Sequence, residues 1–310
     1  MRILFAGTPH AAVPSLEALH ASEHEIVAVL TRPDTRSGRG RSMSRSEVGQ
    51  RADELAIPLL QPRSLRDAEA REAIAALDPD LAVIVAYGGL VPAPVLQLPR
   101  HGWVNLHFSL LPRWRGAAPV QHAIAAGDAQ IGACTFRLEE GLDTGPVYRR
   151  ISMGMPERAT AGDLLETLAV DGAHLLAQTV EDIAAGTARP EAQPADGITL
   201  APKISVDDVH VRFSRPAPVV DRLIRSATPA PGAWCLIAGQ RVKLGPVLPL
   251  HESLPAGELV VTKREVVIGC ELGAVRLGQV QPQGKKAMPA ADFARGARLT
   301  SGMLVDEASL

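Results

Sequence analysis

The chain has 310 residues, of which 46% are hydrophobic and 21% are charged, and its formal net charge is −2. This length predicts two domains, each able to bury an apolar core, and it excludes a small peptide scaffold. No apolar run approaches the ~20 residues that a membrane-spanning helix needs, and the first residues do not resemble a secretory signal. We therefore expect a cytoplasmic globular protein.

The cysteines and the charged residues indicate which kinds of site and partner the chain has. Cys134, Cys235 and Cys270 lie far apart and form no Cys-x-x-Cys pair, which favours buried free thiols over disulfides, a zinc site or redox chemistry. Residues 201–310 hold 14 basic and 10 acidic side chains, whereas the rest of the chain holds 18 basic and 24 acidic ones. The positive excess of the carboxyl-terminal part indicates an anionic partner.

Short apolar runs alternate with amphipathic stretches through the first half of the chain. The predicted strands cover residues 3–5, 26–30, 81–86, 104–106 and 131–138, and the predicted helices cover residues 11–19, 48–55, 68–77 and 159–185. This alternation predicts an α/β fold with a mainly parallel sheet covered on both faces. Ligands of such sheets bind beyond the carboxyl ends of the strands, so the expected site lies near residues 7–9, 87–90 and 105–115.

The sequence changes character after the long helix. Three prolines among small or polar residues in 186–203 indicate a linker. A helix over 219–226 is followed by short apolar runs that Gly and Pro separate, as in a small β-barrel or sandwich. These predicted strands cover residues 234–237, 258–262, 266–270 and 274–280. The last residues, 306–310, are expected to be disordered.

Polar residues gather at the end of the strand predicted over 104–106. Asn105 and His107 are two residues apart, so in extended backbone they project on the same side. An amide donor beside an imidazole suits stabilisation of an oxyanion, although a turn-capping Asn105 and a core His107 would give the same pattern. Asp143 lies in a glycine-rich turn. There its carboxylate can orient a histidine and favour its protonated form, or form an ordinary Asx turn.

A basic segment follows the second predicted strand. Its five arginines are Arg32, Arg36, Arg39, Arg41 and Arg45, placed among small, turn-forming residues. This composition predicts a flexible loop that binds phosphates through forked guanidinium hydrogen bonds, with a merely solvated loop as the alternative. The chain lacks the glycine-rich fingerprints of dinucleotide and ATP sites.

These motifs together resemble the methionyl-tRNA formyltransferase family. Residues 105–112 and 115–119 resemble the signature of enzymes that transfer formyl from 10-formyltetrahydrofolate, and residues 142–145 resemble their catalytic aspartate segment. Two further stretches, 5–9 and 281–288, resemble the tRNA-specific enzymes in particular, as do the arginines of the basic segment.

The resemblance implies a fold and an activity. The fold is a Rossmann-like formyltransferase domain over 1–188, a linker over 189–205 and an OB-like tRNA-binding barrel over 206–310. The activity is transfer of formyl from 10-formyltetrahydrofolate to the amino group of initiator methionyl-tRNA, for translation initiation, by a monomer that needs neither a metal nor a membrane. The alternatives are a nucleotide-amino-sugar formyltransferase and a non-catalytic folate- or RNA-binding protein on the same scaffold.

The resemblance also implies roles for single residues. Asn105 and a protonated His107 would donate hydrogen bonds to the oxyanion, while Asp143 would orient His107 and raise its pKa. The folate-binding turn would consist of Ser109, Leu110, Leu111 and Pro112, acting largely through backbone groups and shape. The predicted tRNA-binding residues are Arg36, Arg39, Arg41, Arg45, Lys285 and Lys286.

Overall fold

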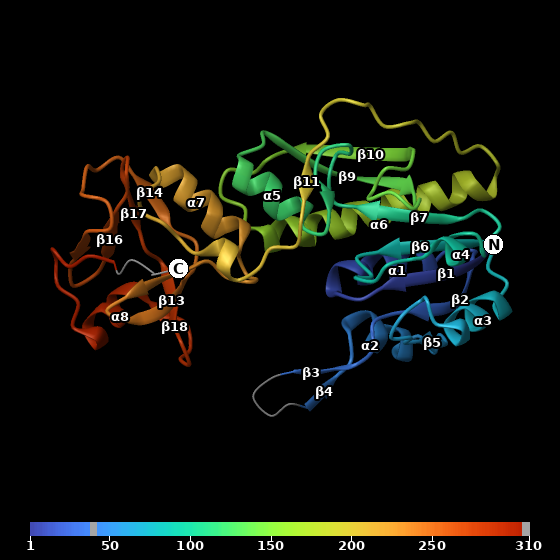
Figure 1. The fold of residues 1–310 in the computed structure, drawn as a ribbon, viewed down its shortest axis with the longest axis horizontal. Coiled ribbons are helices and arrows are strands. Elements are labelled where there is room, and N and C mark those ends of the chain that lie inside the picture. Colours follow the sequence, from blue (N-terminus) through green and yellow to red (C-terminus); the bar gives the residue numbers. More distant parts are fainter. Residues whose placement is uncertain (38–41, 306–310) are drawn as a thin grey trace. The chain divides into compact units, whose positions relative to one another are not determined.

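The computed structural model describes residues 1–37 and 42–305, and Figure 1 shows its helices and strands. The chain forms two compact units. The first comprises Met1–Pro119, Gln130–Gly154 and Leu165–Pro202, and the second comprises Val120–Ala129, Met155–Leu164 and the part from Lys203 onward. The domain boundaries placed at residues 188 and 206 stay a prediction.

The first unit is built on a seven-stranded sheet of order β10-β9-β7-β6-β1-β2-β5. Five neighbouring strands, from β5 to β7, are parallel, whereas β9 is antiparallel to both β7 and β10. The bounds are Arg2–Gly7 (β1), Glu25–Leu30 (β2), Leu59–Leu60 (β5), Leu81–Val85 (β6), Trp103–His107 (β7), Gln130–Arg137 (β9) and Val147–Gly154 (β10). The predicted mainly parallel α/β sheet is confirmed.

Helices cover both faces of this sheet. One face packs α3 (Ala68–Ala76) and α4 (Ala93–Leu96) against a cluster that includes Leu4, Leu30 and Ile84. On the other face α6 (Ala161–Ala184) passes so close to β7 that a Cβ at Gly172 would lie 2.9 Å from the side chain of Leu106. Two further helices, α1 (Val13–His20) and α2 (Glu47–Glu54), complete the amino-terminal part.

The basic segment differs from its prediction. Instead of one irregular loop, β3 (Thr35–Ser37) pairs antiparallel with β4 (Ser42–Ser44). Thr35 is β-branched and suits extended backbone, whereas the arginines and small residues of the segment favoured the interpretation as a loop. The two-residue strands β8 (Arg115–Gly116) and β11 (Leu200–Ala201), which pair in parallel, were also not predicted.

The second unit holds two four-stranded antiparallel sheets, of order β12-β13-β18-β19 and β14-β17-β16-β15. Their strands share one apolar core with α7 (Ala217–Ser226) and α8 (Ala290–Ala297). The strands are Trp234–Ile237 (β12), Gln240–Leu244 (β13), Leu248–Leu250 (β14), Leu259–Val261 (β15), Val266–Gly269 (β16), Ala274–Arg276 (β17), Gln279–Pro282 (β18) and Met288–Pro289 (β19). The predicted small domain of antiparallel strands is confirmed. The helix α5 (Pro119–Ala126) precedes β9 in the chain.

One predicted strand of this unit is two strands. The run over 274–280 divides into β17 and β18, which belong to different sheets. Gly278 stands between them, where a Cβ would lie 2.9 Å from the carbonyl oxygen of Pro246. The chain therefore changes sheet at a residue without a side chain, within a stretch that is apolar enough to look continuous.

Two predictions about the whole chain can be compared with the described residues. Cys134, Cys235 and Cys270 are buried free thiols, as predicted. Within residues 1–37 and 42–305, no helix is long and apolar enough to span a membrane.

Candidate functional site

The candidate site begins at the carboxyl end of β7. Asn105 is half-buried, and within the described chain its side-chain amide makes no hydrogen bond. His107 is 6% exposed, and its ring stands edge-on to Phe136 with 6.2 Å between the ring centroids. One end of the strand therefore presents an unengaged amide donor and, two residues later, a buried imidazole.

Both ring nitrogens of His107 face specific partners. Nε2 lies 2.9 Å from the carbonyl oxygen of Trp114, which can only accept, so Nε2 carries the proton of the neutral ring. Nδ1 lies 3.8 Å from Oδ2 of Asp143. Trp114 adopts the left-handed conformation, with φ of 63°. His107 is thus oriented on both sides, which a histidine that merely fills a core does not require.

Asp143 is held in a turn between β9 and β10. It is 8% exposed and has φ of 49°, a conformation that Asp tolerates better than most side chains. Its Oδ2 accepts a hydrogen bond of 2.7 Å from the backbone nitrogen of Gly116 in β8. The structure therefore brings His107 and Asp143 together across 36 positions of sequence, as the motif reading predicts.

The surroundings of His107 shift the pKa of its ring. The pKa of the imidazole lies below its ordinary value of 6.5 because burial disfavours the charged ring. The Asp143 carboxylate acts in the predicted direction and raises this pKa, and so does the Trp114 carbonyl, but burial outweighs both. The folded chain therefore favours the neutral ring at rest, and the protonated ring that the resemblance implies for the oxyanion step stays a prediction.

The turn predicted to bind folate offers mainly backbone. Ser109 is buried, and its hydroxyl donates to the carbonyl oxygen of Arg113 at 2.6 Å. Leu111 is buried in a cluster with Cys134, Phe136 and Val147. Leu110 is half-buried, and the bond between Leu111 and Pro112 is cis. Contacts of this turn with a ligand would therefore come from its backbone groups and from Leu110 and Pro112, which are both half-buried.

The other two predicted parts of the site, residues 7–9 and 87–90, follow strands that neighbour β7 or lie close to it in the sheet. β1, β6 and β7 are neighbours in the sheet, so their carboxyl ends lie at one edge. The Thr8 hydroxyl after β1 donates to the carbonyl oxygen of Tyr87 after β6 at 2.7 Å. The Thr31 hydroxyl, after β2, lies 2.8 Å from the hydroxyl of Ser46. The loops after four strands thus border one edge.

The predicted tRNA residues of the basic segment have different surroundings. Arg36 belongs to β3, whereas Arg39 and Arg41 lie outside the described residues. The guanidinium of Arg45 forms an ion pair with Asp53 and lies 3.5 Å from Asp34. Two carboxylates therefore already face the Arg45 guanidinium, which weakens it as a phosphate donor.

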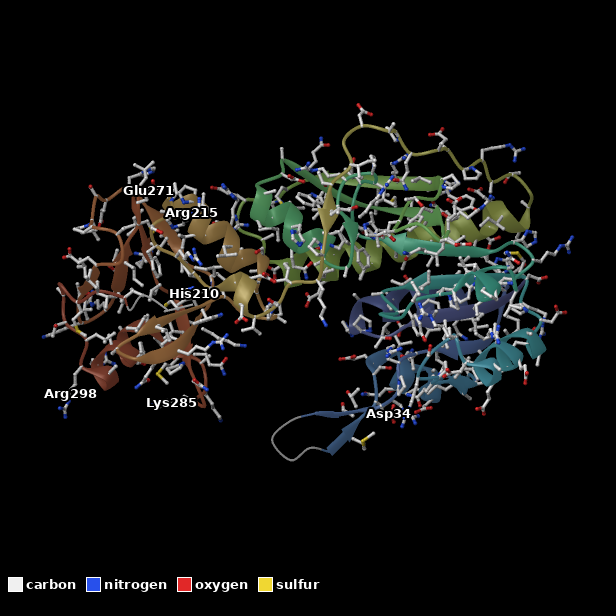
Figure 2. All side chains as sticks on the ribbon, in the orientation of Figure 1. Asp34, His210, Arg215, Glu271, Lys285 and Arg298 are labelled. Atoms are coloured by element: carbon white, nitrogen blue, oxygen red, sulfur yellow. The ribbon has the colours of Figure 1, made fainter. Side chains whose placement is uncertain are left out.

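Three basic residues of the second unit lie at or beside the turn between β18 and β19. Lys285 and Lys286 are exposed in this turn, and Figure 2 labels Lys285. Arg241 in the adjacent β13 was not among the predicted residues, and its guanidinium lies 3.9 Å over the ring of Trp234. The Arg241 carbonyl accepts from the Gln283 nitrogen at 2.9 Å, which fixes that strand beside the lysine turn. Only the pairing of β13 with β18 reveals this neighbourhood.

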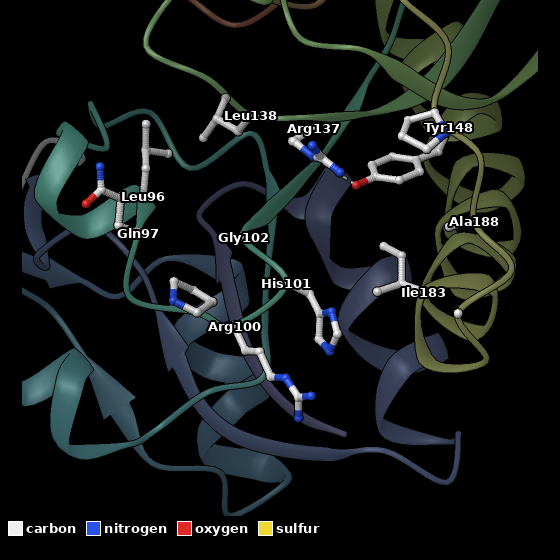
Figure 3. A pocket seen from close by; sticks show the side chains of 13 residues that line it. Leu96, Gln97, Arg100, His101, Gly102, Arg137, Leu138, Tyr148, Ile183 and Ala188 are labelled. Carbon is white, nitrogen blue, oxygen red and sulfur yellow. Dashed lines mark hydrogen bonds between the residues drawn. The ribbon is translucent and has the colours of Figure 1, made fainter.

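A pocket of about 580 Å³ lies at the other end of β7. Figure 3 shows its lining, which includes Arg100, His101, Arg137 and Tyr148 and none of the predicted site residues. Arg137 donates to the Tyr148 hydroxyl at 3.3 Å. The pocket adjoins the residues before β7, whereas His107 ends that strand, so the two are separate features.

Comparison with known proteins decides the family. The formyl transferase domain matches residues 1–180, and the formyl transferase C-terminal domain matches residues 203–298. This chain belongs to the formyl transferase family. Asn105, His107 and Asp143 all lie within the part that the first domain matches.

Individual formyl transferases resemble the chain over nearly its full length. A methionyl-tRNA formyltransferase of Thermobifida fusca is 55% identical over 304 residues, which are 97% of this chain and 98% of the relative. One of Salinispora tropica is 54% identical over 97% of this chain and 99% of the relative. Among solved structures, HypX from Aquifex aeolicus in complex with tetrahydrofolic acid aligns with a TM-score of 0.67 at 20% identity. That alignment covers 96% of this chain and 47% of HypX, and it shows the fold alone.

Within residues 1–37 and 42–305, no group of three or more His, Cys, Asp or Glu side chains could hold a metal ion.

Proposed function

We propose that this chain transfers the formyl group of 10-formyltetrahydrofolate to the amino group of methionine on initiator methionyl-tRNA, for translation initiation. The observation that carries the proposal is the 55% identity to a methionyl-tRNA formyltransferase over 97% of the chain. Both formyl transferase domains, matched over residues 1–180 and 203–298, support it.

The reaction exchanges one carbon–nitrogen bond for another. The methionine amine attacks the formyl carbon, the bond from that carbon to N10 of the folate breaks, and a proton passes from the amine to N10. Negative charge develops on the formyl oxygen during the attack. Donors already directed at that oxygen lower the barrier, because they need no reorganisation when the charge appears.

The Asn105 amide can supply such a donor, and His107 can supply a second one when its Nε2 proton exchanges the Trp114 carbonyl for the oxyanion. The Asn105 amide has no partner among the described residues, so it is available to the oxyanion. The proton on His107 Nε2 points at the Trp114 carbonyl, 2.9 Å away, and a developing oxyanion is a stronger acceptor than this neutral carbonyl. A hydrogen bond that strengthens only as charge develops favours the transition state over the bound substrates.

Asp143 favours the protonated form of the His107 ring. Its Oδ2 faces Nδ1 at 3.8 Å, so a proton taken up at Nδ1 during loss of the amine proton would be stabilised by the carboxylate. A ring that is neutral at rest and acquires its charge beside Asp143 can accept a proton and then return it toward N10. This role requires the low resting pKa that burial gives to His107.

The folate donor fits the edge at which β1, β6 and β7 end. Tetrahydrofolic acid bound to HypX, which shares this fold, supports a folate-type donor here. The turn over 109–112 would contact the folate through its backbone, Leu110 and Pro112, because the Ser109 and Leu111 side chains are buried.

The tRNA would be held by its phosphates. Arg36, Arg39 and Arg41 of the basic segment would contact the acceptor end, and Arg241, Lys285 and Lys286 of the second unit would contact the body of the tRNA. Phosphate contacts release condensed counterions, so binding should weaken steeply as the salt concentration rises. A nucleotide-amino-sugar acceptor is disfavoured, since such a small substrate needs neither basic surface.

Formylation by the purified full chain with competing acceptors tests the proposal. The chain is incubated with 10-formyltetrahydrofolate and either initiator methionyl-tRNA, uncharged initiator tRNA or a nucleotide-linked amino sugar. Formyl-methionine on the charged tRNA alone supports the proposal. Formylation of the amino sugar together with an inert charged tRNA would overturn it.

A further inference from the structure

The segment after α6, which the sequence predicts as part of a linker, crosses the candidate site. Residues 191–201 form hydrogen bonds with the Asp143 turn at one end and with β8 at the other, and we call them the strap. We propose that the strap belongs to the active site and that Gln193 is a positioning residue for Asp143. The proposal rests on the proposed formyl transfer, because it assigns a part in that reaction.

Gln193 links the Asp143 turn to Arg115. Its Nε2 donates to the carbonyl oxygens of Asp143 and Gly145, both at 2.8 Å. Its Oε1 accepts from Nη2 of Arg115 at 2.7 Å and from Nε at 3.2 Å. The amide nitrogen therefore faces two carbonyl oxygens, and the amide oxygen faces the guanidinium of Arg115. These partners determine the orientation of the amide.

The strap also fixes the residues that bind the two catalytic side chains. The Thr199 hydroxyl accepts from the backbone nitrogen of Trp114 at 2.8 Å, and the carbonyl of Trp114 is the acceptor for His107. Ala201 pairs with Gly116, whose nitrogen donates to the Asp143 carboxylate. The His107–Asp143 pair is therefore held by groups that the strap itself positions.

The exposure pattern of the strap agrees with this role. Residues 194–198 are exposed, whereas Gln193 and Thr199 are half-buried and Ala201 is buried. The inward-facing residues are thus the ones with partners around the site. A segment that only connects two units would not place its polar side chains on the backbone of a buried carboxylate.

A substitution that changes the charge of residue 193 but not its size tests whether Gln193 positions Asp143 or only fills space. Gln193→Glu keeps the size and the acceptor for Arg115 but places an oxygen against the carbonyls of Asp143 and Gly145, so it should displace the Asp143 turn. We expect kcat for formylation of methionyl-tRNA to fall about 10- to 100-fold, the usual cost of misplacing a catalytic group by about 1 Å. KM for the tRNA should stay within about twofold, because the change acts on the chemical step.

The pH profile supplies a readout that a purely structural role would not move. Asp143 raises the pKa of His107, so a displaced carboxylate should shift the limb of the kcat profile that reports His107 to lower pH. Thr199→Val should also lower kcat, since it removes the hydroxyl that accepts from the backbone nitrogen of Trp114. Thr199→Ser keeps a hydroxyl and should restore most of the activity.

The control is Gln178→Glu, which makes the same charge change at an exposed position of α6. Normal kcat and an unshifted pH profile in Gln193→Glu would overturn the proposal. So would an equal loss in Gln178→Glu, or a lowered Tm together with lost binding of tetrahydrofolate. If the wild-type chain itself fails to formylate methionyl-tRNA, the proposed function fails instead, and the two failures are thereby distinguished.

Discussion

The backbone nitrogen of Gly116 donates a hydrogen bond of 2.7 Å to Oδ2 of Asp143, the same oxygen that faces His107. Gly116 has φ of 126°, and a Cβ there would lie 2.6 Å from the carbonyl oxygen of Ala201. A side chain at this position would therefore strain the backbone and push β8 away from β11, which moves the donor away from Asp143.

Gly116→Ala should lower the formylation rate about 10²-fold, because it displaces the donor that fixes the Asp143 carboxylate, which we propose takes part in catalysis. Steady-state formylation of methionyl-tRNA measures this loss. The matched control is Gly154→Ala at the end of β10, where a Cβ would meet nothing within 4 Å. Equal rates in the two variants would show that the Gly116 donor is dispensable.

The buried His107 predicts a pH dependence of stability. Its pKa in the folded chain is lowered below 6.5, the ordinary value that we take for the unfolded chain. Between these two values the unfolded chain binds a proton that the folded chain does not. The contribution is therefore fully present above pH 6.5 and is lost as the pH falls toward the folded pKa.

Urea unfolding at pH 7.5 and pH 5.5 measures this effect. The wild-type chain should lose more free energy of unfolding between the two pH values than His107→Gln, which keeps a donor for the Trp114 carbonyl but does not titrate. Parallel losses in the two proteins would contradict the burial of a neutral imidazole.

The strands and helices around the site were predictable because their signals are local. Apolar runs located β1, β2, β6, β7 and β9, and apolar spacing located α2, α3 and α6. Motif resemblance singles out His107 and Asp143 as candidate site residues. Their contact depends on the turn after β9, which the Gly116 nitrogen of β8 holds beside His107, and no local signal in the sequence shows it. The resting charge of His107 was not predictable, since burial of the ring depends on how the surrounding elements pack.

The strap shows the limit of sequence reasoning. Its prolines and polar residues are those of a linker, and nothing local distinguishes Gln193 from a solvated glutamine. Its partners Asp143 and Arg115 precede it by 50 and 78 positions, so they become visible only in three dimensions. Arg241 was not predictable for the same reason, because it lies beside the turn of Lys285 and Lys286 only through the pairing of β13 with β18.

The basic segment predicts a selective effect on tRNA. Arg39→Ala should weaken methionyl-tRNA binding and reduce the slope of log K against log salt concentration by about 1, the change expected for one lost phosphate contact. Binding of tetrahydrofolate should be unchanged. Arg66→Ala, an exposed arginine beside α3, is the control. A parallel loss of folate and tRNA binding in Arg39→Ala would contradict the role of this segment.

The cysteines should be inert in the folded chain. All three are buried, and burial raises the pKa of Cys134 to about 12 and that of Cys270 to about 11. Because the thiolate is the reactive form, iodoacetamide at pH 8 should leave all three unlabelled until urea unfolds the chain. Mass spectrometry counts the adducts. Rapid labelling of Cys134 in the native protein would contradict the packing beneath the site.

We propose that the His107–Asp143 pair at the end of β7 carries out formyl transfer to methionyl-tRNA. A single-turnover measurement with saturating 10-formyltetrahydrofolate and initiator methionyl-tRNA, comparing wild type with Asp143→Asn, tests it most directly. Asp143→Asn keeps an acceptor for Gly116 but removes the charge that faces His107. We predict a rate lower by about 10²- to 10³-fold at an unchanged Kd for the tRNA. Transfer at the wild-type rate would contradict the claim.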